Sequence, residues 1–292
     1  MIIREDFFQR GEESFHFLDW GGQGPIAYLA HATGMCAGTY SPLAGKLTPY
    51  LRVMGMDDRG HGKTRAKADP KELKNWDIFA EDLERFVEFL QEPIIPIGHS
   101  RGGVVGLYLA VKRPELVRAL VLVDPTILPF SWMWWWFLAK KTGLSKFVPI
   151  AARAARRRAE WPDDRTIRES YQAKSNFKQW KKGFLESYLD CGLQPSNNGN
   201  LRLSCEPAWE SKCFSVCPHD VWRFIPRITC PVLILYGEQS DTFLAPAAER
   251  FKRKNPLAIL QSFPGASHFV PMERPDEISA SILDFFRHHS II

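Results

Sequence analysis

The chain has 292 residues, 45% of them hydrophobic and 24% charged, and a formal net charge of +5. This composition is typical of a globular protein and excludes a disordered chain. The small basic excess is too diffuse to indicate a nucleic-acid binder, and the most apolar stretch, residues 127–139, is shorter than the ~20 residues that cross a bilayer. No apolar core follows the charged start, and the six cysteines form no CxxC pair. We therefore expect a cytoplasmic protein whose cysteines are reduced thiols.

Short apolar runs alternate with helical patterns through the first 125 residues. Such near-continuous runs are typical of strands that are buried on both faces of a parallel sheet. They lie at residues 26–30, 52–56, 94–97 and 119–123. Apolar residues recur at helical spacing from Phe79 to Leu90, and a second helical run spans Val104 to Lys112. The alternation predicts an α/β fold with a mostly parallel central sheet flanked by helices.

Residues 127–222 follow a different pattern, with several helical segments and no clear buried strand. In one of these segments the aromatic residues from Phe177 to Tyr188 share a helical face, and Gly192 is a predicted C-terminal cap. A connection of this length would be improbable as a bare loop in a compact domain. We interpret it as a helical cap inserted over the carboxyl edge of the sheet.

The strand and helix alternation returns after the cap. Strands are predicted at residues 232–236 and 258–263, and a closing helix begins at Pro275. We therefore expect an α/β core of residues 1–126 and 223–292, with a helical cap of residues 127–222.

The strongest chemical signal is the sequence GHSRG at residues 98–102, between an apolar run and a helical run. At a strand-to-helix junction, Gly-x-Ser-x-Gly forms a turn so tight that only glycine fits two residues on either side of the serine. The turn lifts the hydroxyl of Ser100 above the sheet. It also aims the main-chain N–H of Arg101 at an oxyanion formed beside that hydroxyl. We predict that Ser100 is a nucleophile.

A serine nucleophile needs a base that takes its proton and returns it to the leaving group. His268 follows the last predicted strand, on a glycine-containing loop that can reach over the sheet edge. The histidine needs a carboxylate that holds its tautomer. Asp241 is the predicted acid, with Glu238 and Asp124 as alternatives, although Asp124 is also explained as a turn residue before a proline.

These residues, in the order Ser100, Asp241, His268, resemble the α/β-hydrolase superfamily. The resemblance spans nearly all of the chain outside the cap. It includes DDRGHGKT at residues 57–64, which is similar to the family's D-x-R-G-x-G-x-S loop and which we interpret as architectural. The chain departs from the family pattern at the acid, which usually lies three residues after the strand-ending glycine, where this chain has Ser240.

The resemblance also implies a second donor to the oxyanion. The family commonly carries His-Gly after its third strand, whereas residues 31–35 of this chain read HATGM. Counting without gaps from His31 places the N–H of Thr33 at the donor position, and aligning Thr33-Gly34 with His-Gly places Met35 there instead. We expect Thr33 and Arg101 to form the oxyanion hole.

The cap carries a cluster of indoles and a basic run. The indoles are Trp132, Trp134, Trp135 and Trp136. We interpret most of them as packing the cap against the core, the alternatives being an apolar substrate pocket or a lid surface that meets lipid. The basic run consists of Arg153, Arg156, Arg157 and Arg158. It is interpreted as a solvated helix face, with contact to an anionic membrane interface as the alternative.

Together these features predict a capped serine hydrolase that cleaves a carboxylic ester or lactone with an apolar portion through an acyl-enzyme intermediate. We expect no metal, no cofactor and no nucleic-acid partner, and a membrane surface only under the lipid interpretation of the indoles. Two rivals remain. One is hydrolysis of a carbon–carbon bond in a β-diketone-like compound, and the other is a small-ligand receptor that keeps the triad.

Overall fold

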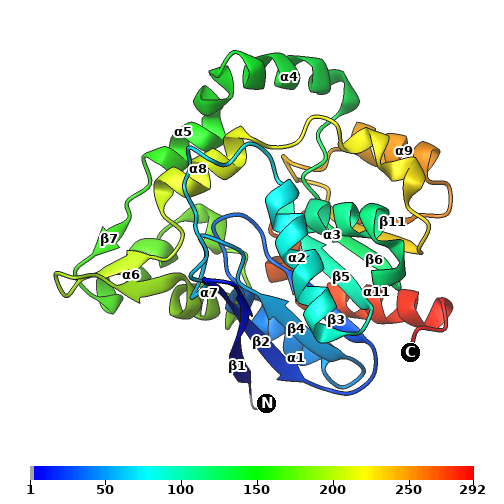
Figure 1. Cartoon of the computed structure of the whole chain (residues 1–292), viewed down its shortest axis with the longest axis horizontal. Coiled ribbons are helices and arrows are strands. Elements are labelled where there is room, and N and C mark those ends of the chain that lie inside the picture. The colour runs from blue at the N-terminus through cyan, green and yellow to red at the C-terminus, as the bar shows by residue number, and fades with distance from the viewer. Residues whose placement is uncertain (1–2) are drawn as a thin grey trace.

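A computed structural model describes residues 3–292, and its core is an eight-stranded sheet with the order β1-β2-β4-β3-β5-β6-β10-β11 (Figure 1). The pairs β1–β2 and β2–β4 are antiparallel, and all other neighbours are parallel. The strands are β1 (Arg4–Arg10), β2 (Glu13–Gly21), β3 (Ile26–Ala30), β4 (Arg52–Met56), β5 (Ile94–His99), β6 (Leu120–Val123), β10 (Val232–Gly237) and β11 (Ile259–Phe263). Every strand predicted from an apolar run is present, and the mostly parallel α/β sheet is confirmed.

Two antiparallel strands at one edge of the sheet, β1 and β2, were not predicted from the sequence. β1 is mostly charged and exposed, and Phe8 is its buried residue. An edge strand of this kind lacks the two-sided burial that makes a parallel strand visible in sequence. Its pairing with β2, in which Phe8 lies opposite Phe15, supplies the missing constraint.

Helices cover both faces of the sheet. One face packs against α2 (Asp77–Leu90), α3 (Arg101–Lys112) and α9 (Ala245–Lys254), and the other against α1 (Ser41–Leu47) and α11 (Pro275–His288), which follows the short α10 (Val270–Glu273). The sheet therefore separates two apolar clusters. Neighbouring residues of β3 alternate between them, with Tyr28 in one cluster and Ala27 in the other. This alternation explains why the strand is apolar at successive positions.

Between β6 and β10 the chain leaves the sheet (Figure 1). This segment contains α4 (Met133–Lys141), α5 (Pro149–Ala155), α6 (Asp164–Gln172), α7 (Phe184–Gly192) and α8 (Pro207–Ser215). It also contains a small antiparallel sheet of β7 (Glu160–Trp161), β9 (Leu201–Leu203) and β8 (Leu193–Pro195). Strands this short carry no alternation that sequence analysis could detect. We keep the bounds 127–222 as a proposal and call this segment the insertion. None of the helices among residues 3–292 combines the length and apolarity that spanning a membrane requires.

The predicted aromatic helix is interrupted in the structure. Phe177 ends a short 3-10 helix, and α7 begins only at Phe184. Gly183 has a φ of +93°, and this left-handed conformation cannot continue a right-handed helix. The aromatic rings still gather, because the ring centroids of Phe177 and Trp180 are 4.7 Å apart. Gly192 is the last residue of α7, but the cap position is taken by Leu193 in an extended conformation, so the prediction of Gly192 as the cap is wrong by one residue.

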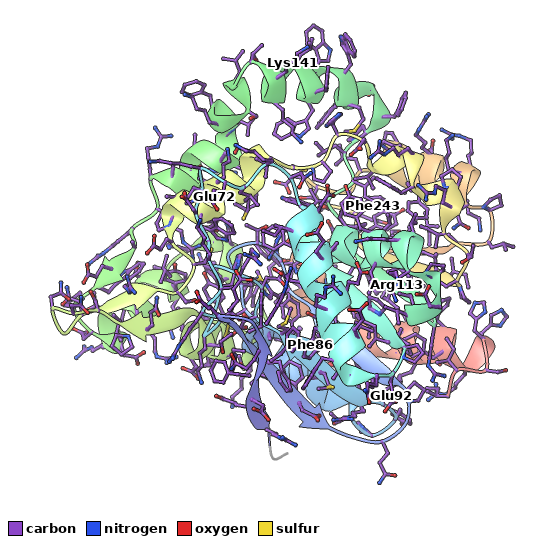
Figure 2. All side chains as sticks on the ribbon, viewed as in Figure 1. Glu72, Phe86, Glu92, Arg113, Lys141 and Phe243 are labelled. Atoms are coloured by element: carbon purple, nitrogen blue, oxygen red, sulfur yellow. A yellow bond between two sulfur atoms is a disulfide. The ribbon has the colours of Figure 1, made fainter. Side chains whose placement is uncertain are left out.

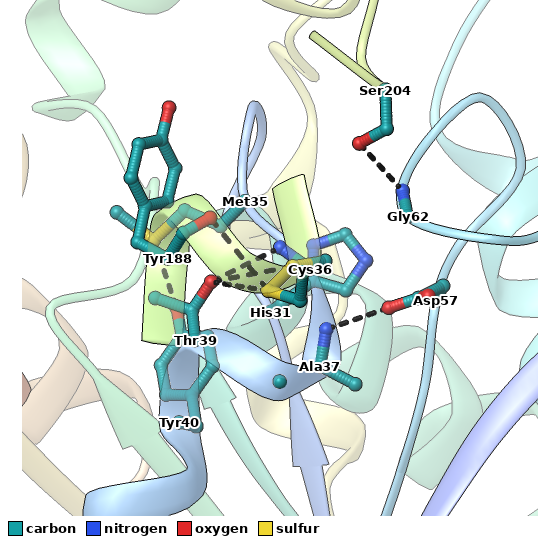
Figure 3. The surroundings of a disulfide bond; sticks show 12 residues. His31, Met35, Cys36, Ala37, Thr39, Tyr40, Asp57, Gly62, Tyr188 and Ser204 are labelled. Carbon is teal, nitrogen blue, oxygen red and sulfur yellow. Dashed lines mark hydrogen bonds between the residues drawn. A yellow bond between two sulfur atoms is a disulfide. The ribbon is translucent and has the colours of Figure 1, made fainter. Parts of the chain in front are cut away.

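A disulfide joins the insertion to the core (Figure 3). Cys36, in the loop after β3, is bonded to Cys191 in α7, and 155 positions separate them in sequence. The expectation that all six cysteines are reduced thiols is therefore wrong for this pair. Two cysteines so far apart leave no spacing signal, because connectivity cannot be read from sequence alone. The free cysteines are Cys205, Cys213, Cys217 and Cys230.

Reduction of this disulfide should lower the thermal stability of the protein. A cross-link that closes a long loop restricts the unfolded chain and typically stabilises the fold by about 2–4 kcal/mol. We expect dithiothreitol to lower the Tm of the wild type by about 5–10 °C. The double variant Cys36→Ser/Cys191→Ser should melt at that lower temperature with or without reductant.

Scanning calorimetry measures both temperatures, and mass spectrometry after alkylation reports the state of the thiols. Cys230→Ser, which removes a free cysteine, is the matched control and should keep the wild-type response. Equal melting temperatures for the oxidised and the fully alkylated wild type would show that the cross-link does not stabilise the fold.

Candidate active site

Ser100 lies at the turn between β5 and α3, with φ +57° and ψ −117°. A non-glycine residue adopts this conformation only where its surroundings impose it. The flanking glycines are required by space. A Cβ on Gly98 would lie 2.3 Å from the carbonyl oxygen of Gly102, and one on Gly102 would lie 2.2 Å from that of Ala30. The tight turn expected from the Gly-x-Ser-x-Gly sequence is present at the carboxyl edge of the sheet.

His268, in the loop between β11 and α10, is paired with Asp124 rather than with Asp241. Its Nδ1 lies 2.7 Å from Oδ1 of Asp124, which is buried at the end of β6. The same carboxylate accepts hydrogen bonds from the main-chain N–H of Gly237 at 3.0 Å and from the hydroxyl of Ser240 at 2.6 Å. Three donors therefore satisfy this buried carboxylate, and one of them is the imidazole.

Asp241 does not meet His268 as expected. Its side chain is exposed, and its carboxylate accepts a hydrogen bond from the hydroxyl of the next residue. The position that the family pattern reserves for the acid holds Ser240, whose hydroxyl donates to Asp124. The chain therefore brings a carboxylate to the imidazole from the neighbouring strand. The other alternative, Glu238, is exposed and accepts a hydrogen bond from a surface serine.

A second contact holds the main chain of the histidine loop. The carbonyl oxygen of His268 accepts a hydrogen bond from Nε2 of His99 at 2.9 Å, and Nδ1 of His99 lies 2.7 Å from the hydroxyl of Tyr40. Because Nε2 must donate to a carbonyl, Nδ1 of the neutral ring accepts from the tyrosine. Burial and the neighbouring His268 hold the pKa of His99 well below its usual value, which keeps the ring neutral. His99 thus ties the serine turn to the histidine loop.

The two expected oxyanion donors are the main-chain N–H groups of Thr33 and Arg101. Within residues 3–292, no protein acceptor takes the N–H of Thr33 or that of Arg101. The N–H of Met35, the other candidate, donates to the carbonyl of Ala32 at 3.2 Å and is therefore occupied. The buried side chain of Arg101 fixes the loop, because its Nε donates to the hydroxyl of Thr33 at 3.0 Å.

The partner of the Ser100 hydroxyl in the structure is Thr126. The two hydroxyl oxygens are 3.0 Å apart, and the N–H of Thr126 donates to the carbonyl of Ser100 at 3.2 Å. Sequence reasoning missed Thr126, because no motif marks the segment that follows β6. Ser100, Thr126 and His268 line the same cavity, so the predicted serine and histidine lie at one site.

This cavity has a volume of about 640 Å³ and a mostly apolar wall. Thr33, Ser100, Thr126 and His268 contribute polar groups to it, and Asp241, Thr242 and Arg153 also border it. The rest of the lining is Trp76, Leu128, Trp132, Trp135, Trp136, Ala139, Val148, Pro149, Ile150, Phe214 and Cys217. A smaller hollow of about 310 Å³ also borders His268 and Asp241, and its other lining residues are mainly polar.

The expected packing of the indoles against the core is wrong for three of the four. Trp136 is half-buried, and its Nε1 donates to the carbonyl of Cys217 at 2.6 Å. Trp132, Trp134 and Trp135 are exposed, and the first and last of these also border the cavity.

Residues 57–64 are architectural, as expected. The carboxylate of Asp57 accepts hydrogen bonds from the N–H of Ala37 and of Lys63 at 2.8 and 2.9 Å, and the first of these anchors the segment beside the disulfide (Figure 3). Arg59 binds the buried Asp82, with its Nε 2.6 Å from the carboxylate. The loop thereby braces the core beneath the site.

The site combines a hydroxyl on a constrained turn, an imidazole paired with a buried carboxylate, and two unoccupied N–H groups. Such a set can add a serine oxygen to a carbonyl carbon and stabilise the oxyanion that results. Among residues 3–292, no group of three or more His, Cys, Asp or Glu side chains is placed to hold a metal ion.

Comparisons with known proteins identify the family of the chain. A 2-(acetamidomethylene)succinate hydrolase of Mesorhizobium japonicum is 24% identical over 265 residues, which cover 90% of this chain and 88% of that protein. The monoglyceride lipase of Mus musculus is 28% identical over 279 residues, which cover 88% of this chain and 79% of the lipase. A solved E-2-(acetamidomethylene)succinate hydrolase has the same fold, with a TM-score of 0.82 at 21% identity over 98% of this chain and 100% of that one. The model of the alpha/beta hydrolase family matches residues 27–281, and the chain therefore belongs to this family of hydrolases.

Proposed function

We propose that the protein is a serine hydrolase that cleaves a carboxylic ester or lactone with an apolar portion. The observation that carries this proposal is one cavity that contains both Ser100 and the Asp124-paired His268 and whose wall is otherwise mostly apolar. Similarity to a monoglyceride lipase supports ester cleavage. A β-diketone-like substrate would place a second carbonyl against this wall, which offers few donors to it.

In the proposed mechanism Ser100 attacks the carbonyl carbon while its proton passes to Nε2 of His268. Asp124 holds the proton on Nδ1, which leaves Nε2 free to accept, and it stabilises the imidazolium that forms. The N–H groups of Thr33 and Arg101 stabilise the tetrahedral oxyanion. His268 then protonates the leaving oxygen, which departs and leaves an acyl-enzyme. Water activated by the same imidazole releases the acid and restores the serine.

Attack requires the Ser100 hydroxyl to turn from Thr126 toward His268. Hydrogen bonds of a catalytic serine are often incomplete before substrate binds and form in the complex. Before substrate binds, Thr126 therefore holds the Ser100 hydroxyl at the cavity wall. Binding of the substrate would release this hydroxyl from Thr126. The apolar cavity would take the acyl chain, and the polar hollow beside His268 would take a polar leaving group or the incoming water.

Loss of the nucleophile should abolish turnover. We expect Ser100→Ala to lower kcat by about a millionfold, the scale seen when the nucleophile of a triad is removed. The kcat of the variant and of the wild type is measured with p-nitrophenyl esters of increasing acyl length. For the wild type, kcat/KM should rise with acyl length, because the cavity wall is mostly apolar. A fluorophosphonate should label the wild-type peptide that contains Ser100.

Ser131→Ala, at an exposed position, is the matched control and should keep wild-type activity and labelling. Undiminished turnover of any of these esters by Ser100→Ala would refute the proposed nucleophile.

Two carboxylates lie close to the site, those of Asp124 and Asp241, and substitution shows which of them acts as the acid of the triad. Asp124→Asn should lower kcat by about 10⁴-fold, because the ring loses the partner that fixes its tautomer. Asp241→Asn removes an exposed carboxylate that borders both hollows but has no contact with the imidazole, and it should lower kcat far less than Asp124→Asn does. Steady-state kinetics on one soluble ester compares the two, and circular dichroism confirms that both fold.

A rescue variant sharpens this test. The hydroxyl of Ser240 lies 2.6 Å from the Asp124 carboxylate, so a carboxylate at position 240 would begin close to the same point. We expect Asp124→Ser/Ser240→Asp to recover part of the activity that Asp124→Ser loses. A large loss in Asp241→Asn together with an active Asp124→Asn would reverse the assignment.

A further inference from the structure

The helix α4 is apolar around most of its circumference although it lies at the outer edge of the molecule (Figure 1). It reads MWWWFLAKK, and a helix that is apolar on all sides is normally buried. One side of α4 borders the cavity, but another side has no protein cover, because Trp134 and Trp135 are 64% and 72% exposed. Figure 2 shows large side chains projecting from this helix around the labelled Lys141.

Exposed apolar side chains continue from the turn before α4 to the start of α5. They are Trp132, Trp134, Trp135, Leu144, Phe147 and Ile150, and we call this set the apolar face. A concentration of exposed aromatic and aliphatic groups in one short segment is typical of an interaction surface rather than of ordinary solvent-exposed chain.

The charge of the segment identifies the kind of partner. Between Asp124 and Glu160 the chain carries seven basic residues and no acidic residue. Arg157 turns inward to Glu210, at 2.9 Å, and Lys140 donates to two main-chain carbonyls. Arg158 is exposed too, and its Nε donates to the main-chain carbonyl of Glu160. The other exposed cations, which lie beside the apolar face, are Lys141, Lys146, Arg153 and Arg156. None of these four pairs with a carboxylate in the part of the chain that the structure describes.

We propose that the apolar face and its cations dock on an anionic lipid surface. Indoles and aliphatic side chains enter the boundary between headgroups and acyl chains, while lysine and arginine bind the anionic headgroups. A second copy of the chain fits this face less well, because two such faces would bring like charges together. Docking itself does not depend on the proposed catalytic function.

The apolar face adjoins the cavity, so docking there would bring lipid next to the site. Trp132, Trp135 and Ile150 belong to the apolar face and also line the cavity that contains Ser100. Apolar surface therefore runs continuously from the outside of α4 into the cavity. Given the proposed ester hydrolysis, an acyl chain can pass from the lipid layer to the serine without crossing water.

Sedimentation with vesicles tests the proposal. The Ser100→Ala protein is mixed with sucrose-loaded vesicles of phosphatidylcholine alone or of phosphatidylcholine with phosphatidylserine, which separates binding from turnover. We expect binding to the vesicles that contain phosphatidylserine, a decline of that binding with salt, and a blue shift of tryptophan emission. Neutral vesicles should bind at least about tenfold less, since each basic residue near such a surface contributes about 1 kcal/mol.

Variants on the face separate its two components. Trp134→Ser/Phe147→Ser changes two side chains that do not border the cavity and should weaken binding to both kinds of vesicle. Lys141→Glu/Lys146→Glu should remove the preference for phosphatidylserine. Phe89→Ser/Leu257→Ser, at exposed apolar positions in other parts of the chain, is the matched control and should bind as the parent does. Made with Ser100 intact, each variant should hydrolyse a short soluble ester at the wild-type rate.

Two results would overturn the proposal. One is absence of binding, or binding that is equal for neutral and anionic vesicles. The other is a dimer in sedimentation velocity that Trp134→Ser/Phe147→Ser dissociates, which would make the face a self-association interface. Vesicle binding by a protein that hydrolyses no ester would leave the docking proposal standing and remove the proposed function.

Discussion

The buried carboxylate of Asp124 is the constraint on which the site depends. A charged group without water must be surrounded by donors, since an unpaired buried carboxylate costs several kcal/mol. Here the donors come from the end of β10, through Gly237 and Ser240, and from the loop after β11, through His268. The N–H of Asp124 also donates to the carbonyl of Leu235 at 2.7 Å. One side chain thus brings the ends of three segments together, and the imidazole takes its position from that requirement.

The same contact explains why the carboxylate that pairs with His268 could not be predicted from sequence, whereas Ser100 and His268 could be expected to lie at one site. Ser100 and His268 are marked by local signals, a glycine-flanked turn and a loop after the last strand. The acid is defined by adjacency in space. β6 and β10 are paired, with Val123 opposite Leu235, so a carboxylate after either strand can reach the same point. Only the three-dimensional pairing shows that Ser240 is used as a donor to Asp124.

The same distinction between local sequence signals and contacts in space applies to other features of the structure. The parallel strands could be placed to within one or two residues, because their apolar runs are continuous, whereas the antiparallel strands β1 and β2 could not. The contact of Thr126 with Ser100 and the disulfide between Cys36 and Cys191 form only in the folded chain, and no sequence motif marks either of them. The exposure of Trp134 and Trp135 could not be predicted either, because an apolar helix has the same sequence pattern whether protein or lipid covers it.

The loop that carries Thr33 is where the insertion and the core are coupled. Next to it, Nε2 of His61 accepts the N–H of Gly34 at 3.2 Å, a role that suits a neutral ring, and burial together with the positive charge of Arg101 holds the pKa of His61 well below its usual value. On the other side, Cys36 is bonded to α7 of the insertion. A displacement of α7 would therefore be transmitted to the N–H of Thr33, while α4 at the far end of the insertion carries no such cross-link. One end of the insertion is thus fixed to the loop beside the site, whereas α4, at the other end, borders the cavity and presents exposed apolar side chains to solvent.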